Sequence, residues 1–230
     1  MTHYLNHIFF ASFIGVSMCL GVTQVKIERP LGACLSITSV KDSQDYNLKG
    51  FNKVNIGKGF KVEISRSDQY HVSIVGDKNY IERYAPFVQN NTLQLKYIGK
   101  EEDYKSKVDL KIKIHLPSLN SINLNGKTES LINGFSNVDS LDIIVSGSSV
   151  ATIAGEVRNA WVEVSGKSNL FAKELTTNRS VVNISYHSYC ELTVKDSLFG
   201  NVSSGANLIY KGNAKERVIL SNGKVSHSHK

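Results

Sequence analysis

The stretch that decides the fold runs from residue 120 to residue 212, where the chain repeats one pattern five times. The five segments are SINLNGKTESLI (121–132), LDIIVSGSSVATI (141–153), WVEVSGKSNLFA (161–172), VVNISYHSYCEL (181–192) and NVSSGANLIY (201–210). In each, apolar and polar residues alternate, a small polar residue and usually a glycine follow, and a second apolar run ends the segment. This alternation is typical of β-strands on either side of a sharp turn.

The turn points of the five segments are regularly spaced. They are Gly126, Gly147, Gly166, Tyr186 and Gly205, separated by 21, 19, 20 and 19 residues. A repeat of about 20 residues with an internal period of two indicates stacked β-structure. We therefore expect an all-β fold, a parallel β-helix or solenoid-like stack of such turns, preceded by a less regular β region between residues 51 and 115.

The repeat also predicts which side chains face the interior. Before the turns these are Ile122, Leu124, Ile143, Val145, Val162, Val164, Val182 and Ile184. After the turns they include Leu131, Val150, Ile153, Leu170, Cys190, Leu192, Leu208 and Tyr210. In the fifth segment we expect the register to slip, with Ser203 in the place of an apolar residue.

One column of small polar residues stands immediately before the turn points. We expect these side chains to form a structural ladder of hydrogen bonds along the stack, with glycine allowing the sharp corner. The column consists of Asn125, Ser146, Ser165, Ser185 and Ser204. Tyr186 interrupts the glycines, so its corner must be looser or its side chain must point outward.

The region before the repeat alternates less regularly. Residues 60–64 and 71–75 are expected to pair as a hairpin. A short helix is expected at 77–84 with Asp77 as its N-cap, and Asn90–Asn91 is expected to form a turn. The run VDLKIKIHL at 108–116 predicts an amphipathic strand that Pro117 ends.

The N-terminus carries an uncharged apolar run. Residues 8–20 are 13 positions without a charge, too short to span a bilayer comfortably but typical of a signal-peptide core. We therefore divide the chain into a signal peptide (1–23), an irregular lead (24–49), the repeat domain (50–214) and a charged C-terminal tail (215–230). The alternative is a buried N-terminal strand or helix.

Three cysteines bear on the compartment. Cys19 leaves with the predicted signal peptide, so Cys34 and Cys190 remain in the mature chain. Either Cys34 pairs with Cys190 in an oxidising compartment, or Cys190, on an apolar strand position, is a buried free thiol. Lipid attachment at Cys34 or Cys19 is a third alternative, but each lacks part of the expected pattern.

Composition limits the partners. The formal net charge is +7, but the lysines and arginines are scattered and form no nucleic-acid-binding motif. We therefore expect no nucleic-acid partner. The histidines have no metal-ligand spacing, and the glycines around Lys58 do not form a phosphate loop, so no metal or other cofactor is expected.

Several quoted stretches together resemble a known bacterial family. They are FNKVNI (51–56), FKVEI (60–64), LQL (93–95), HLPSL (115–119), VSG (145–147 and 164–166) and GANLIYKG (205–212). The chain resembles the DUF2807 family, also called the putative auto-transporter adhesin, head GIN domain family, over roughly residues 51–214. The resemblance implies a β-helix-like stack in an exported or envelope protein, although residues 125–127 and 186–188 depart from the usual corner.

Candidate chemistry is sparse. Asp142 and Glu163 are expected at the same outward position of adjacent turns, where paired carboxylates could perform acid–base catalysis or hold a cation. The alternative reading is two solvated surface acids. For surface recognition the candidates are Trp161, Tyr186, His187 and Tyr189, whose rings could stack on sugars if they point outward; otherwise the aromatic residues fill the stack or cover its ends.

These observations predict a function without naming a ligand. We expect an exported, non-enzymatic β-solenoid of the bacterial cell envelope, located in the periplasm, on the outer-membrane surface or outside the cell. Its expected role is adhesin-like binding of a glycan or a protein. The alternatives are a structural or assembly protein that forms homo-oligomers through strand edges or solenoid ends, and a polysaccharide-acting enzyme that uses Asp142 and Glu163.

Overall fold

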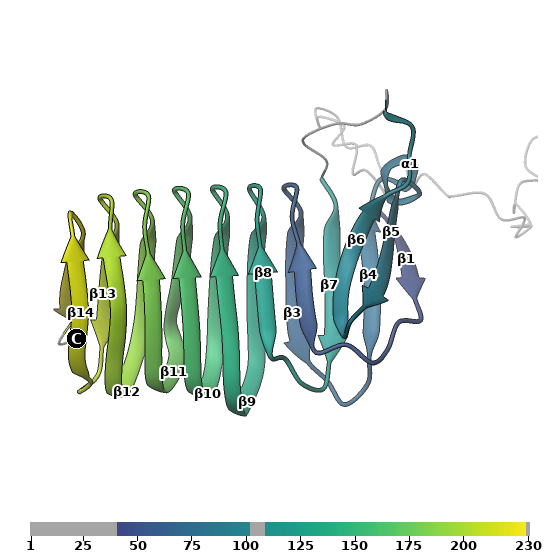
Figure 1. Ribbon diagram of the computed structural model, residues 1–230. Helices are drawn as coiled ribbons and strands as arrows, with labels where there is room; N and C mark the ends of the chain where they lie inside the picture. The colour runs from purple at the N-terminus through teal and green to yellow at the C-terminus, as the bar shows by residue number, and fades with distance from the viewer. Residues whose placement is uncertain (1–40, 102–108, 229–230) are drawn as a thin grey trace, which may run out of the picture. The chain divides into compact units, whose positions relative to one another are not determined.

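The chain forms a stack of β-strands joined by tight turns (Figure 1). The computed structural model describes residues 41–101 and 109–228, so the predicted signal peptide, Cys19 and Cys34 lie outside the described residues. The elements are β1 (Asp42–Tyr46), β2 (Lys53–Ile56), β3 (Lys61–Arg66), β4 (His71–Gly76), α1 (Lys78–Ile81), β5 (Tyr84–Gln89), β6 (Thr92–Tyr97), β7 (Lys111–Leu116), β8 (Ser121–Leu124), β9 (Glu129–Val145), β10 (Val150–Val164), β11 (Asn169–Ile184), β12 (Tyr189–Ser203), β13 (Asn207–Lys211), β14 (Lys215–Ser221) and β15 (Lys224–Ser228).

The strands form two ladders that enclose the core. The entry ladder, which leads into the tight turns, contains β6, β2, β8, the second halves of β9 to β12, and β14. The exit ladder, which leaves them, contains β1, β4, β7, β3, the first halves of β9 to β12, β13 and β15. Pairing is parallel within the repeat, so each turn lies in register on its neighbour. The predicted β-solenoid is confirmed.

The first turns of the stack are not in sequence order. Strands β2 and β3 lie between β6–β7 on one side and β8–β9 on the other, although β6 and β7 follow them in the chain. Strand β7 lies between β3 and β4, so the expected hairpin of residues 60–64 and 71–75 is wrong. The helix α1 has Asp77 as its N-cap, accepting a hydrogen bond from the Asn79 N–H, as expected.

The interior matches the predicted set before the turns and differs in two places after them. All eight predicted residues before the turns are buried. After the turns, Leu131 is 44% exposed and Val150 is half-buried, because Ser130 and Ile132 take the inward positions of that strand and Ala151 takes that of the next. The expected register slip in the fifth segment is also wrong, since Val202 pairs with Ile184 in the apolar column.

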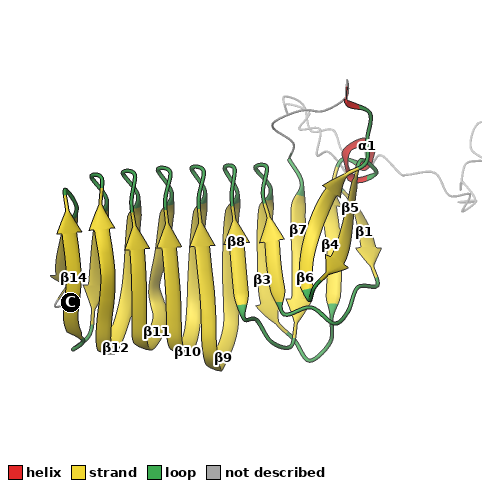
Figure 2. Ribbon diagram, viewed as in Figure 1, coloured by secondary structure: helices red, strands yellow, loops and turns green. Residues whose placement is uncertain are grey.

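Each of the five turns in the sequence repeat contains a pair of consecutive left-handed residues. The pairs are Gly126–Lys127, Gly147–Ser148, Gly166–Lys167, Tyr186–His187 and Ser204–Gly205, all with φ between 51° and 73°. These turns line one edge of the stack, and the wider bends line the other (Figure 2). Tyr186 therefore adopts the geometry of the glycines, and its ring points outward with 64% exposure.

A ladder of buried hydroxyls runs along these turns, two residues after the turn points rather than before them. The Thr128 N–H donates to Ser149 Oγ at 3.1 Å, the Ser149 N–H to Ser168 Oγ at 3.1 Å, and the Ser168 N–H to Ser188 Oγ at 3.2 Å. The predicted column Asn125, Ser146, Ser165 and Ser185 is half-buried, and Ser203 rather than Ser204 completes it. Its backbone carbonyls accept from the hydroxyls, as in the 2.7 Å bond from Ser149 Oγ to the Ser146 oxygen.

Residues 24–49 and 215–230 contain more structure than the sequence indicated. Strand β1 lies within the expected irregular lead and pairs with β4. Strands β14 and β15, within the expected tail, form a further turn of the stack on β12 and β13. Within the described residues, no helix has the length and apolar character needed to span a bilayer.

Candidate binding surfaces

A row of exposed apolar side chains crosses the outer face of the entry ladder. Trp161, Val181 and Phe199 occupy one register position on β10, β11 and β12, and they are 51%, 36% and 38% exposed. Arg217 continues the row on β14, and Asp142 precedes it on β9. Because alternate residues of a strand point to opposite faces, these five side chains point away from the core.

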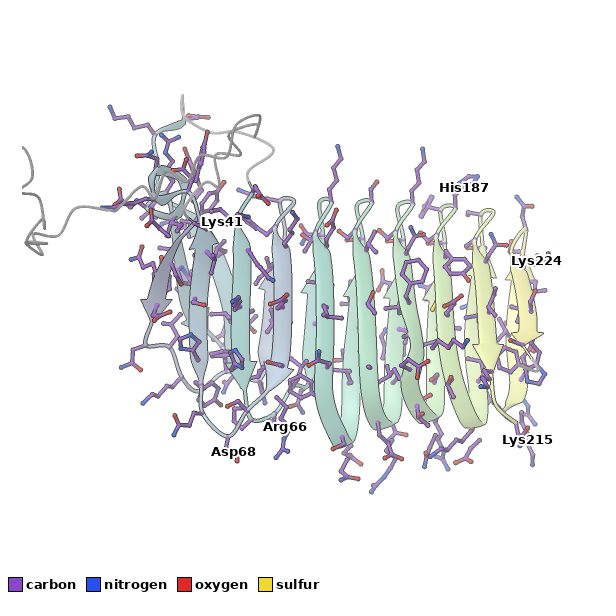
Figure 3. All side chains as sticks on the ribbon, turned by 180° about the vertical axis from the view of Figure 1, so that it is seen from behind. Lys41, Arg66, Asp68, His187, Lys215 and Lys224 are labelled. Carbon is purple, nitrogen blue, oxygen red and sulfur yellow. The ribbon has the colours of Figure 1, made fainter. Side chains whose placement is uncertain are left out.

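The four predicted surface residues do not form one site. Trp161 lies on the entry ladder and Tyr189 begins β12 on the exit ladder, while Tyr186 and His187 occupy the tip of the turn between the ladders. Figure 3 shows His187 at the edge formed by the tight turns. Tyr186 is five residues beyond the position that pairs with Trp161, a separation of about 16 Å along the strand.

Tyr189 is engaged by its own neighbours. Its hydroxyl hydrogen-bonds to Glu191, and its ring centroid lies 5.8 Å from that of Phe171. Burial and the hydrogen bond to Glu191 raise the pKa of Tyr189 to about 12. The hydroxyl is therefore protonated at neutral pH and already bonded, whereas the Phe171 ring beside it is 39% exposed.

The two acids considered as a carboxylate pair, Asp142 and Glu163, are offset by two residues in the register of β9 and β10. Asp142 is in register with Trp161, whereas Glu163 is in register with Ile144 and Asn183. The expected placement of the two acids at the same position of adjacent turns is therefore wrong. The two side chains face solvent on neighbouring strands but are offset by two residues. They are therefore not directly beside each other, as paired carboxylates need to be.

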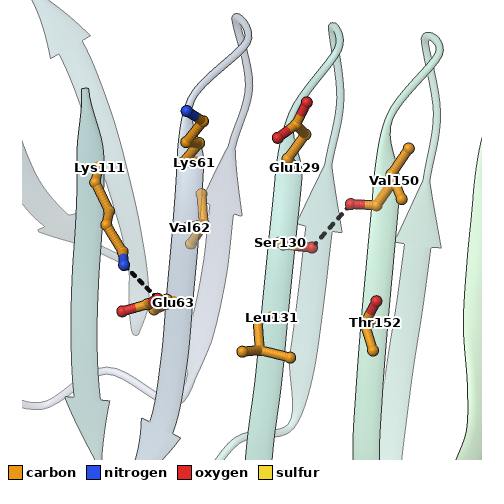
Figure 4. Close-up of a pocket in the computed structure, with 9 residues that line it drawn as sticks. All are labelled: Lys61, Val62, Glu63, Lys111, Glu129, Ser130, Leu131, Val150 and Thr152. Atoms are coloured by element: carbon orange, nitrogen blue, oxygen red, sulfur yellow. Dashed lines mark hydrogen bonds and ion pairs between the residues drawn. The ribbon is translucent and has the colours of Figure 1, made fainter. Parts of the chain in front are cut away.

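A shallow depression lies on the outer face of the exit ladder, across β7, β3, β9 and β10 (Figure 4). Its volume is about 410 Å³, and Lys111 and Glu63 form an ion pair across its rim. Leu131 and Thr152 contribute exposed side chains, and the Ser130 hydroxyl donates to the Val150 carbonyl at 3.3 Å. Its charged groups thus have partners of the opposite sign close by, and its apolar surface is small.

The comparisons with known proteins agree with this architecture. The family model described as "Putative auto-transporter adhesin, head GIN domain" (DUF2807) matches residues 50–214. The chain belongs to this family. No curated protein matches the sequence of this DUF2807 chain.

Two crystal structures share the fold of the DUF2807 chain. One is a putative adhesin from Bacteroides fragilis, with a TM-score of 0.65 and 22% identity, covering 83% of this chain and 98% of that one. The other is a putative lipid binding protein from Parabacteroides distasonis, with a TM-score of 0.51 and 15% identity, covering 83% of this chain and 98% of that one. At these identities the likeness shows the fold alone.

The fold of the DUF2807 chain brings two distant histidines together. The rings of His71 and His115 lie 5.7 Å apart on β4 and β7. Asp45 Oδ1 lies 3.5 Å from His71 Nε2, and Ser65 Oγ lies 3.0 Å from His115 Nδ1. Across residues 41–101 and 109–228, no group of three or more His, Cys, Asp or Glu side chains is placed to hold a metal ion.

Cys190 is a free thiol in the core of the DUF2807 domain. It is fully buried, in an inward column with Ala151, Leu170 and Leu208. Burial, and secondarily the neighbouring Glu191 carboxylate, raises the pKa of the thiol. Among the described residues Cys190 is thus a buried free thiol, as one of the sequence alternatives has it, and Cys34 lies outside them.

We expect Cys190 to react with a thiol reagent only when the stack opens, because both burial and the raised pKa suppress the thiolate. In the mature chain, residues 24–230, with Cys34 replaced by serine, labelling should be negligible under native conditions and complete in denaturant. The control is Asn183→Cys, an exposed outward position on the neighbouring strand, which should label at once. Native labelling of Cys190 at the rate of that control would contradict a buried thiol.

Proposed function

We propose that this chain is an exported, non-enzymatic β-solenoid of the bacterial cell envelope that binds a surface ligand, a glycan or a protein, in an adhesin-like role. One observation carries the proposal. Large aromatic side chains stand exposed on a stack that has a continuous core in which to bury them. They are Trp161 (51%), Tyr186 (64%) and Phe199 (38%).

Backbone strain at Tyr186 supports a role for these rings. Three other turns place glycine at this position, whereas here a tyrosine adopts φ 54°. A non-glycine residue in the left-handed region costs about 1 kcal/mol, and such strain is concentrated at functional sites. The outward ring is thus kept at a position where glycine would give a more stable turn.

Family membership and the apolar run at residues 8–20 support export to the envelope. The experiment has two parts. Cell fractionation of the native host should recover the chain in an envelope or extracellular fraction. The mature chain, residues 24–230, should bind members of a glycan and surface-protein array, and replacing these three aromatic residues with serine should abolish this binding without lowering the melting temperature. A cytoplasmic location, or unchanged binding by the serine variant, would count against the proposal.

A second candidate function, envelope assembly, is favoured by the C-terminal end of the stack. Leu220 belongs to the inward column of Leu124, Val145, Val164, Ile184 and Val202, all fully buried, yet it is 52% exposed because no further strand covers it among the described residues. Solenoids need their ends covered. A second copy of the chain docking on β14 and β15 would cover it.

For this candidate we expect the mature chain to self-associate at micromolar concentration and Leu220→Lys to make it monomeric, since a charge cannot enter a covered apolar end. Sedimentation velocity measures both. The control is Leu131→Lys, because Leu131 is similarly exposed at 44% but lies on an outer face in the middle of the stack. A monomeric parent chain, or equal effects of the two substitutions, would exclude assembly through this end.

A further inference from the structure

The outer face of the entry ladder carries cations beside its aromatic row. Arg179 on β11 and Lys215 on β14 share a second register position, with Ser197 between them on β12. Arg217 on β14 follows Phe199 in the first row. The aromatic–cationic face is defined by these side chains: Trp161, Val181, Phe199, Arg179, Lys215 and Arg217.

The register sets the spacing within this face. Adjacent strands lie about 4.8 Å apart, and residues two apart along a strand lie about 6.6 Å apart. Phe199 therefore has Arg217 directly beside it and has Arg179 and Lys215 on its two diagonals. Figure 3 labels Lys215 at the edge of the bends, away from the tight turns. Three positive groups thus surround one exposed aromatic ring.

These cations form no ion pair with an acidic residue of 41–101 or 109–228. Within the part of the chain that the structure describes, no ion pair involves Arg179, Lys215 or Arg217, whereas Arg158 pairs with Asp139 at 2.8 Å and Lys195 pairs with Glu156 at 3.2 Å. The outward acids in the rows of this face are Asp142 and Glu163, on β9 and β10. The face is therefore positive over β11 to β14 and negative at its other end.

We propose that the aromatic–cationic face binds an anionic polysaccharide that lies across the strands. Its sugar rings pack on Phe199 and Trp161, and its carboxylate or sulfate groups lie at Arg179, Lys215 and Arg217. This inference rests on the proposed function and names the class of ligand and the face that binds it. Charge complementarity with three unpaired cations selects an anionic ligand.

The arrangement of polar groups selects a sugar chain. A sugar ring has an apolar C–H face bordered by hydroxyl groups, so it fits a narrow apolar row between hydrogen-bonding rows. Here the row is one residue wide, and Asn183 and Asn201 are exposed on one side of it. Amide side chains both donate and accept hydrogen bonds, which suits hydroxyl groups that do the same.

The same arrangement disfavours two other anionic partners. A membrane surface needs a contiguous apolar area to enter the bilayer. Here Asn183 and Asn201 border the apolar row on one side, with Ile219 adding one exposed apolar side chain at the β14 end, and Arg179 and Lys215 border it on the other. Nucleic-acid affinity depends mainly on many phosphate contacts, and a uniformly charged strand lying along the row would meet Asp142 and Glu163 at its negative end. A polysaccharide that is charged only at some units avoids this repulsion.

The test measures binding of the mature chain to two acidic polysaccharides, polygalacturonate and chondroitin sulfate, by calorimetry at low and moderate salt. Carboxyl-reduced polygalacturonate is the neutral probe. We expect Phe199→Ala and Phe199→Leu each to weaken acidic binding about tenfold, as central aromatic contacts do. The double variant Lys215→Ala/Arg217→Ala should weaken it at least as much at low salt and reduce its salt dependence.

The chain offers a matched control on its opposite face. Phe171 is 39% exposed and Phe199 is 38% exposed, on the exit and entry ladders respectively. Phe171→Ala should leave binding within twofold of the parent chain, and thermal unfolding of all variants should match the parent.

Four results would overturn the inference: no binding of either acidic probe, equal binding of the neutral probe, equal losses for Phe171→Ala and Phe199→Ala, or tighter binding of single-stranded DNA or phosphatidylglycerol vesicles. Array binding by the parent chain that Phe199→Ala leaves unchanged in affinity would remove this inference and leave the proposed function intact. Loss of all array binding in the parent chain would instead remove the proposed function.

Discussion

Replacing Gly200 with alanine is expected to lower the free energy of unfolding by about 4 kcal/mol, because the backbone is strained there and no space exists for a side chain. Gly200 has φ 129°, and a Cβ at this position would stand 1.8 Å from the Val182 carbonyl oxygen and 2.8 Å from its carbon. These are backbone atoms of the adjacent strand, so relief requires the ladder itself to move. Urea unfolding followed by circular dichroism measures the loss.

The control for this prediction is Gly50→Ala. Gly50 also has a positive φ, 75°, but a Cβ there would meet nothing within 4 Å. Gly50→Ala should lower the free energy of unfolding by only the strain of a left-handed alanine, about 1 kcal/mol. If the two substitutions cost the same, close approach of the strands would not be the reason for glycine at residue 200.

Ser149→Ala is expected to destabilise the chain by about 2 kcal/mol, because it leaves a buried donor without its acceptor. Ser149 is fully buried; its hydroxyl accepts from the Thr128 N–H and donates to the Ser146 carbonyl. The bond from the Thr128 N–H is buried, so the alanine variant bears the cost of leaving that donor desolvated without a partner. Thermal and urea unfolding should both show the loss.

The equivalent position in the first turn suggests how Ser149 can be rescued. Thr128 occupies that position and donates its hydroxyl to the Asn125 carbonyl at 2.7 Å, so Ser149→Thr should retain most of the stability. Ser148→Ala, one residue away on the exposed side of the turn, should cost less than about 0.5 kcal/mol. A threonine variant as unstable as the alanine variant would show that the hydroxyl bonds are not the cause.

The stacked repeat was predictable from sequence because its signals are local. Alternation fixes which of Val162 and Glu163 faces inward, and glycine fixes the corner at Gly147 and Gly166. The same logic failed in the fifth segment for one reason. The left-handed pair there is Ser204–Gly205, so glycine takes the second place of the pair and counting back from Gly205 shifts the strand by one residue. Gly200, which stands in the inward column of Val182, carries no hydropathy signal that would reveal the shift.

Other features were set by contacts that no local pattern reports. The insertion of β7 between β3 and β4 joins segments that are far apart in the chain, and alternation alone cannot say which strands are neighbours. The inward face after the first turn was misassigned because Ser130 is buried and Leu131 exposed. There a hydrogen bond to the Val150 carbonyl stabilises the buried serine, against its hydropathy.

The candidate sites were only partly readable for the same reason. Trp161 and Tyr186 point outward, which was one of two alternatives that the sequence left open. Their separation and the pairing of Trp161 with Val181 and Phe199 required the register. The cations beside Phe199 were missed, although they lie on outward positions of predicted strands. Aligning Arg179, Ser197 and Lys215 by turn would have shown the second row.

The hydrogen bonds between turns run along the axis of the stack, and this orientation has a mechanical consequence. A pulling force applied to the C-terminal turn along that axis opens the bonds of one turn before it loads those of the next. Each released turn of about 20 residues adds roughly 70 Å of extended chain. A surface protein built in this way would lengthen stepwise under tension and dissipate the load, while the turns that are still stacked keep their outer faces unchanged.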